Sequence, residues 1–105
     1  MIVVKVEEAE RIENPHGVDV RKLISVDNAE IFLITLKPGE GLKRHTTPVD
    51  AFLYVIKGRG IVEVGEEKEE VRKATLVYLP KEVPHRVMNT GSLEMKFLII
   101  KVDGR

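Results

Sequence analysis

The sequence predicts an all-β domain, a small sandwich or barrel of short strands. No segment shows a sustained helical period of 3.6 residues. Short runs rich in Val, Ile, Leu and Phe recur along the chain instead, and each run ends at a turn signal. A chain of 105 residues has room for one hydrophobic core. We therefore expect a single domain that spans residues 1–105.

The turn signals place the strands. Asp27-Asn28, Pro38-Gly39 and Gly58-Arg59-Gly60 interrupt the first half of the chain, and the residue types of Pro38-Gly39 suit a type II turn. In the second half, the strands are interrupted by turn signals at Gly65, Pro80 and Asn89-Thr90-Gly91. Residues 1–17 are expected to form an N-terminal strand or arm. Eight strands are predicted, with a ninth possible near the N-terminus, at residues 18–26, 29–36, 52–56, 61–64, 68–72, 75–79, 83–88 and 93–102.

Several predicted strands are apolar on both faces, as in residues 31–34, 52–56 and 97–100. A sheet with one face in water alternates more cleanly between apolar and polar residues. The second apolar face therefore needs a cover. A second subunit is the simplest cover, which predicts a homodimer formed by sheet-to-sheet packing. The alternative is that the N-terminal arm of the same chain covers this face.

Composition excludes several classes of partner. Seventeen basic residues balance seventeen acidic ones, and no basic stripe could follow a phosphate backbone, so we expect no nucleic-acid partner. The acidic run from Glu66 to Glu70 is typical of a solvated hairpin. No apolar stretch is long enough to span a membrane, and the N-terminus does not resemble a signal peptide, so we expect no membrane association and a cytoplasmic protein. The absence of Cys, Gln and Trp, with abundant charge, is typical of heat-adapted proteins.

Two histidines are the candidate functional residues. His45 follows the Pro38-Gly39 turn, and His85 follows Pro80 and Pro84 on a later strand. Two hairpins separate them, so a closed barrel can bring the two rings face to face. Because the chain has no cysteine, any metal there must be held by imidazole, carboxylate, backbone or water ligands.

The order of residues around these histidines resembles the cupin superfamily. The first cupin motif is matched by Gly39-EGLKR-His45-Thr46-Thr47-PVD-Ala51-FLYVIK-Gly58. The second is matched by Ala74-TLVYL-Pro80-Lys81-Glu82-VP-His85-RVM-Asn89. The two motif regions, residues 39–58 and 74–89, agree with the family pattern in spacing. The resemblance implies a short antiparallel double-stranded β-helix, the jelly-roll barrel of cupins.

The departures from the cupin pattern fall on its metal ligands. In the family, a His-x-His pair, a Glu and the later His commonly hold a divalent metal inside the barrel. Here Thr47 stands for the second His and Ala51 for the Glu, so only His45 and His85 remain. Ala74 and Glu82 replace two turn glycines of the second motif.

Two residues are candidates to complete a metal site. Asp50 is adjacent to the lost carboxylate, although strand alternation turns it away from the side of Ala51 unless Pro48 or a bulge shifts the register. His16 lies in the arm, which could fold over the barrel mouth from the same or the partner subunit. The resemblance then implies a metal-dependent enzyme, oxygenase-like or isomerase-like, and histidine ligands favour Zn, Ni, Fe or Cu.

The loss of two metal ligands slightly favours another hypothesis, a non-catalytic module that binds a small molecule in the barrel. A third, metal-free hypothesis makes His45 or His85 a general base. Pockets for small molecules are mostly apolar with a few polar groups. The candidate polar contacts are His45, His85, Thr47 and Tyr54, and the candidate walls are Phe52, Leu53, Val77 and Met88.

Overall fold

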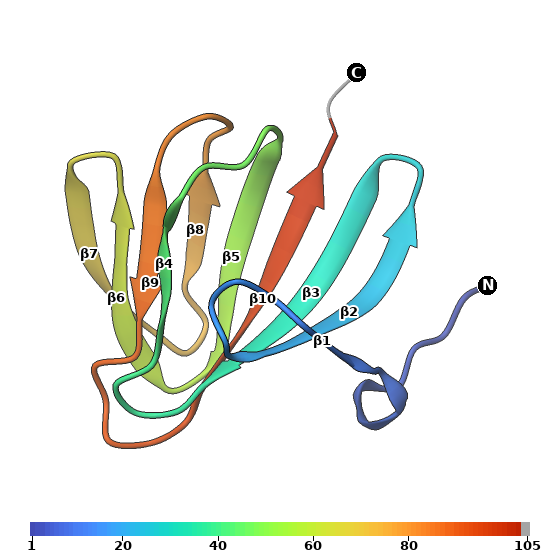
Figure 1. The fold of residues 1–105 in the computed structure, drawn as a ribbon, viewed down its shortest axis with the longest axis horizontal. Coiled ribbons are helices and arrows are strands. Elements are labelled where there is room, and N and C mark those ends of the chain that lie inside the picture. The colour runs from blue at the N-terminus through green and yellow to red at the C-terminus, as the bar shows by residue number, and fades with distance from the viewer. Residues whose placement is uncertain (104–105) are drawn as a thin grey trace.

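The computed structural model, which describes residues 1–103, contains two antiparallel sheets that face one another (Figure 1). The larger sheet has the strand order β1-β2-β3-β10-β5-β8, and the smaller has the order β4-β9-β6-β7. A short 3₁₀ turn, η1 (Val6–Glu8), precedes them. The strands are β1 (Arg11–Ile12), β2 (Asp19–Val26), β3 (Ala29–Leu36), β4 (Gly41–His45), β5 (Asp50–Lys57), β6 (Arg59–Val64), β7 (Glu67–Arg72), β8 (Leu76–Leu79), β9 (His85–Met88) and β10 (Met95–Val102).

This arrangement confirms the all-β prediction and corrects the strand list. Strand β4 was not predicted, and β1 lies within residues 1–17, where a strand or arm was expected without a position. Their sequences explain why: β4 has a single large apolar residue, Leu42, and β1 has only Ile12. Neither shows the apolar alternation by which a strand is recognised, and both form because a neighbouring strand offers hydrogen-bond partners. Among residues 1–103, no helix is long and apolar enough to cross a membrane.

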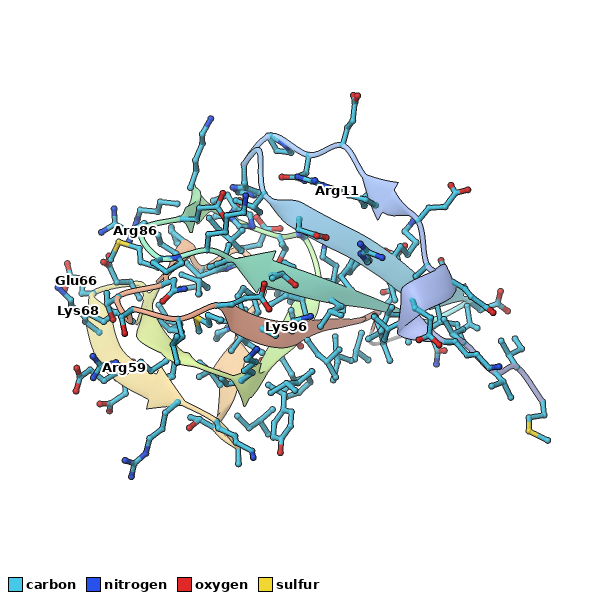
Figure 2. The ribbon with its side chains drawn as sticks, turned by 90° about the horizontal axis from the view of Figure 1, so that it is seen from below. Arg11, Arg59, Glu66, Lys68, Arg86 and Lys96 are labelled. Carbon is cyan, nitrogen blue, oxygen red and sulfur yellow. The ribbon has the colours of Figure 1, made fainter. Side chains whose placement is uncertain are left out.

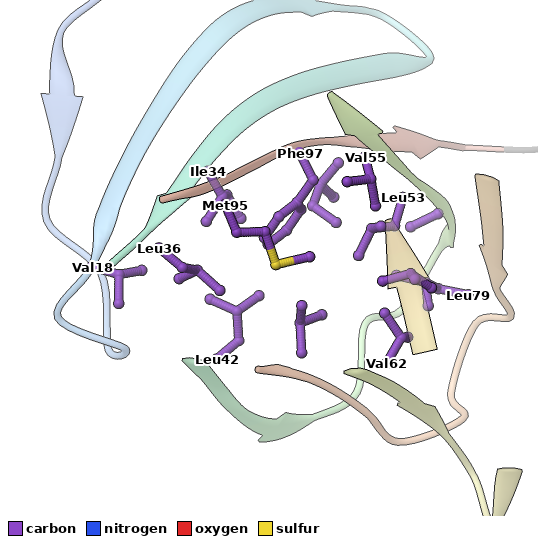
Figure 3. Packing of buried hydrophobic residues seen from close by; sticks show 14 of the residues in the cluster. Val18, Ile34, Leu36, Leu42, Leu53, Val55, Val62, Leu79, Met95 and Phe97 are labelled. Carbon is purple, nitrogen blue, oxygen red and sulfur yellow. The ribbon is translucent and has the colours of Figure 1, made fainter. Parts of the chain in front are cut away.

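The hydrophobic core lies between the two sheets (Figure 3). Phe97 and Met95 of β10, Leu53 and Val55 of β5, and Leu36 of β3 have no measurable exposure. Each strand contributes alternate residues to this core, as the period of two requires. Full burial of an aromatic or aliphatic side chain contributes about 1.5–3 kcal/mol relative to exposure, so this packing is the main force that holds the sheets together.

The side chains that face the space between the sheets differ from one end of the strands to the other. On β10 the row runs from Phe97 through Ile99 to Lys101, and on β5 it runs from Leu53 to Ala51. One end of the space between the sheets is therefore filled by large apolar side chains. The other end contains a cavity of about 330 Å³, where small and polar side chains lie among apolar walls.

The acidic run forms a solvated hairpin, as predicted. Strands β6 and β7 pair from Arg59↔Arg72 to Val64↔Glu67, and Gly65 turns with a φ of 59°. Residues 66–70 are all exposed. Figure 2 shows Glu66 and Lys68 projecting from this end of the molecule. The run serves solubility and takes no part in the cavity.

The outer face of the larger sheet is apolar and open. Tyr54 of β5 pairs with Leu98 of β10 and with Leu76 of β8, and Tyr54, Leu76 and Tyr78 are between 39% and 61% exposed. The N-terminal arm leaves this part of the face open, and its own residues 1–6 are exposed as it extends away from the sheets (Figure 1). The homodimer stays a prediction, which light scattering of the purified chain decides.

Several turns adopt backbone angles that favour glycine. At the Pro38-Gly39 turn, Gly39 has a φ of 85° and the Glu40 N–H donates to the Lys37 carbonyl at 2.9 Å, which is the predicted type II geometry. Ala74 and Glu82, however, have φ values of 66° and 63° without being glycine. An L-residue in this left-handed region is strained.

We expect Ala74→Gly and Glu82→Gly each to raise the free energy of unfolding. Relief of the left-handed strain is worth about 1–2 kcal/mol, and the greater freedom of glycine in the unfolded chain cancels part of it, which leaves a gain of about 0.5–1 kcal/mol. Urea titration measures the change. The control is Ala29→Gly in β3, which must destabilise; a loss of stability in both turn variants contradicts the strain argument.

Candidate functional site

A β-bulge turns His45 into the space between the sheets. Strands β4 and β9 pair at Leu42↔Val87 and again at His45↔His85, so three steps on β4 match two steps on β9. Leu42, Val87 and His85 face inward, and without the extra residue His45 would face outward. The two imidazoles therefore become direct cross-strand neighbours, and their ring centroids lie 4.4 Å apart.

Backbone carbonyls fix which nitrogen of each ring carries the proton. The Nδ1 of His45 lies 2.7 Å from the carbonyl oxygen of Lys43, and the Nδ1 of His85 lies 3.4 Å from that of Val83. A carbonyl oxygen only accepts, so Nδ1–H is the donor in both contacts. In a neutral imidazole the other nitrogen then holds a lone pair. Both Nε2 atoms are hydrogen-bond acceptors.

The loop between β1 and β2 adds a third imidazole, that of His16, in which Nδ1 is the acceptor and Nε2 carries the proton. The Asn14 side chain donates to the carbonyls of Ile12 and Val18 and accepts from the His16 and Val18 N–H groups, which fixes the loop. His16 then lies with its ring centroid 4.9 Å from that of His45. Its Nδ1 accepts from the Lys43 N–H at 2.8 Å, so in the neutral ring the proton is on Nε2.

The three histidines line the cavity, together with apolar walls from both sheets. Thr47 is buried and its hydroxyl donates to the Val49 carbonyl at 3.0 Å, while Ala51 lies at the cavity floor with 1% exposure. Within the described residues, no aspartate or glutamate is among those that line it. The other lining residues are Asn14, Pro15, Val20, Phe32, Ile34, Leu42, Thr46, Pro48, Leu79, Ile99 and Lys101.

Burial and mutual proximity lower the pKa of two of the imidazoles, which favours their neutral form. Burial, followed by the nearby His45, lowers the pKa of His85, and Lys101 and His16 add smaller effects in the same direction. The His85 contact to the Val83 carbonyl opposes them. Burial, then His45 and Lys43, lowers the pKa of His16. The cavity therefore disfavours a further positive charge on either ring.

Several residues predicted for the pocket lie elsewhere. Asp50 is on the outer side of β5, where its carboxylate accepts from the Tyr78 hydroxyl at 2.9 Å and the Lys81 N–H at 3.0 Å. Tyr54 is on the same outer face, as is Phe52, whose ring lies 5.4 Å from that of Tyr78. Leu53 is in the closed core. Val77 and Met88 do not line the cavity either.

His45, His85 and Thr47 do line the cavity, and His16 of the same chain joins them. Sequence reasoning missed Phe32 and Lys101. A signal existed for Lys101, because it continues the row of Phe97 and Ile99 at a spacing of two and so faces inward.

The chain matches the family model of the cupin domain over residues 32–101. It therefore belongs to the cupin family, which the fold and the position of the cavity already indicated. The match includes both motif regions and β3 through most of β10.

Curated relatives are only partly covered by this chain. It is 35% identical over 57 residues to the uncharacterized protein MJ1618 of Methanocaldococcus jannaschii, which is 54% of this chain and 45% of that protein. It is 30% identical over 88 residues to protein SchB of Streptomyces halstedii, which is 78% of this chain and 64% of that protein. The match thus spans less than two thirds of the length of either relative.

Solved structures share the fold over nearly the whole chain. A predicted oxalate decarboxylase from Thermotoga maritima superposes with a TM-score of 0.88 at 22% identity, covering 98% of this chain and 100% of that one. An RmlC-like cupin with a double-stranded β-helix fold from Methanocaldococcus jannaschii gives 0.78 at 23%, covering 98% and 94%. At these identities the likeness establishes the double-stranded β-helix fold alone.

The residues present do not fit the four-ligand metal site that the cupin motifs imply. Ala51 offers no ligand atom, and the Thr47 hydroxyl is bonded to a carbonyl. Asp50 points away, and His16 carries its proton on Nε2, the nitrogen that would have to ligate. In residues 1–103, no group of three or more His, Cys, Asp or Glu side chains is arranged to hold a metal ion.

Acidification is expected to destabilise the fold through His85 and His16. Their pKa values are lowered in the folded chain, so the unfolded chain binds more protons once the pH falls below the ordinary histidine pKa of about 6.5. Stability is complete above that pH and is lost as the pH falls towards the lowered values. Thermal melts from about pH 8 to about pH 5.5 measure the decline. His85→Gln and His16→Gln should flatten it, and profiles parallel to the wild type would contradict the assignment.

Proposed function

We propose that this chain is a small-molecule-binding cupin whose ligand lies in the cavity beside His45 and His85. The observation that supports the proposal is a pair of imidazoles that line a cavity with largely apolar walls and whose Nδ1 atoms are engaged by backbone carbonyls, which leaves both Nε2 atoms as acceptors. Binding sites for small molecules combine apolar walls with a few fixed polar groups in this way. The lost metal ligands leave the two imidazoles free for direct contact with a ligand.

The polar groups specify what such a ligand carries. Two lone pairs on neighbouring rings, with centroids 4.4 Å apart, favour a donor group such as a hydroxyl. Phe32, Ile34 and Ile99 favour an apolar body next to it. The volume of about 330 Å³ lies in the range of small-molecule pockets, which is about 300–1,000 Å³. The ligand we propose is a compact molecule with an apolar part and at least one hydroxyl.

A metal-dependent enzyme is the second candidate, and the same two Nε2 atoms favour it. Imidazole nitrogen binds Zn, Ni, Cu or Fe, and metal-ligating histidines usually donate their other N–H to a carbonyl or carboxylate, as His45 and His85 do. Two protein ligands fall short of the three that catalytic zinc sites use. The first candidate therefore has the stronger support.

Benzyl alcohol is a suitable probe, with benzyl methyl ether as the partner that lacks a donor. We expect chemical-shift changes in amide NMR spectra on β3, β9 and β10, around the cavity, and weaker binding of the ether. The hydroxyl has one hydrogen to donate, so replacing the imidazole that accepts it, by His45→Ala or His85→Ala, should weaken alcohol binding about fivefold, because that acceptor is worth about 1 kcal/mol. Tyr54→Ala, on the outer face, is the matched control and should leave binding unchanged.

Metal analysis of protein purified without a metal-affinity tag separates the two candidates. The small-molecule proposal expects far less than one metal ion per chain. Near-stoichiometric metal that both His45→Ala and His85→Ala abolish would overturn it in favour of the metal site. Alcohol binding that is insensitive to both substitutions would overturn the placement of the ligand.

A further inference from the structure

A lysine lies beside the position from which the carboxylate has been lost. Lys101 of β10 is the direct cross-strand partner of Ala51 of β5, and both residues line the cavity. Side chains of directly opposed residues start from Cβ atoms about 4.5–5.5 Å apart. Lys101 thus brings an ammonium group to the cavity lining from the strand next to Ala51, where the cupin motif has a carboxylate.

No ion pair among residues 1–103 neutralises the charge of Lys101. In the part of the chain that the structure describes, Lys101 forms no ion pair. Its other cross-strand neighbour is Glu30, but that carboxylate is 3.2 Å from the Lys22 Nζ and 3.3 Å from the Ser25 hydroxyl. The Lys101 Nζ instead lies 5.0 Å from the centroid of the Phe32 ring.

The other side chains that line the cavity add hydrogen-bond donors or neutral acceptors, and the nearby Glu30 carboxylate is paired with Lys22. His16 offers Nε2–H, and the cavity has no acidic side chain among its lining residues in the described part of the chain. A cation would therefore be repelled by Lys101 without a carboxylate to compensate. An anion would gain a charge-assisted hydrogen bond in a partly buried site, where such bonds are strongest.

We infer that the cavity selects a small organic carboxylate, received by the ammonium group of Lys101, which lies on the strand next to the one that lacks the metal-binding glutamate of the cupin motif. This inference rests on the proposed small-molecule function and names the charge of its ligand. The carboxylate lies against Lys101, with the His16 Nε2–H as a second donor, and the apolar body contacts Phe32 and Ile99. A hydroxyl on the same molecule donates to the Nε2 atom of His45 or of His85. The substitution of Ala51 leaves room for the carboxylate.

Mandelate and mandelamide test the charge preference, because they share a ring and a hydroxyl and differ in the carboxylate. NMR titration of wild-type protein should show mandelate bound about tenfold more tightly, the gain expected of a charge-assisted hydrogen bond. Lys101→Met should abolish that preference and leave mandelamide affinity nearly unchanged. Lys96→Met is the matched control, since Lys96 is on the same strand but on its outer face (Figure 2), and it should keep the preference.

Ala51→Glu supplies a second variant. The new carboxylate would face Lys101 and pair with it, so mandelate should lose its advantage even though Lys101 is present. Equal affinity of mandelate and mandelamide in the wild type, or a preference that survives Lys101→Met, would overturn the inference. If benzyl alcohol still binds at His45 and His85 in that case, the proposed function stands. If neither mandelate nor benzyl alcohol binds, both are wrong.

Discussion

The packing of the two sheets against one another is the constraint on which the rest of the molecule depends. It requires every second residue of a strand to face inward, and it fills one end of the space with Phe97, Leu53 and their neighbours. The other end contains the cavity, where small and polar side chains such as Ala51 and Lys101 lie among apolar walls. One departure from strict alternation creates the site: the bulge in β4 places His45 opposite His85 instead of facing it outward.

The chemistry of the cavity follows from small changes on a shared fold. The backbone still orients two imidazoles with their Nε2 lone pairs inward, as a metal site would need. Ala51 has removed the carboxylate, and Lys101 adds a positive charge across the ladder. The cavity therefore keeps two imidazoles in the positions of a cupin metal site but has the positive charge that favours an anionic ligand. The fold alone does not indicate this, because one fold accommodates many functions.

Much of the architecture could be predicted from the sequence, and the failures have physical causes. The spacing of the cupin motifs located His45 and His85, and turn residues located most strands. The inner walls were assigned poorly because β5 is apolar on both faces, so alternation alone does not say whether Leu53 or Tyr54 faces inward. The position of Ala51 in the motif would have fixed the phase: residues 51, 53 and 55 are inward, and Phe52 and Tyr54 outward. The contact of His16 with Lys43 depends on a loop that the Asn14 side chain organises, and no periodic pattern reveals such a contact.

The central claim is that the cavity presents two acceptor nitrogens from His45 and His85 and one donor from His16. Long-range proton–nitrogen NMR correlation of the imidazole rings, recorded near neutral pH, tests it directly because the two nitrogens of a neutral ring differ in chemical shift according to which one is protonated. The structure predicts the proton on Nδ1 in His45 and His85 and on Nε2 in His16. Protons on Nε2 of both His45 and His85 would contradict the account, since the cavity would then present donors where a hydroxyl is proposed to bind.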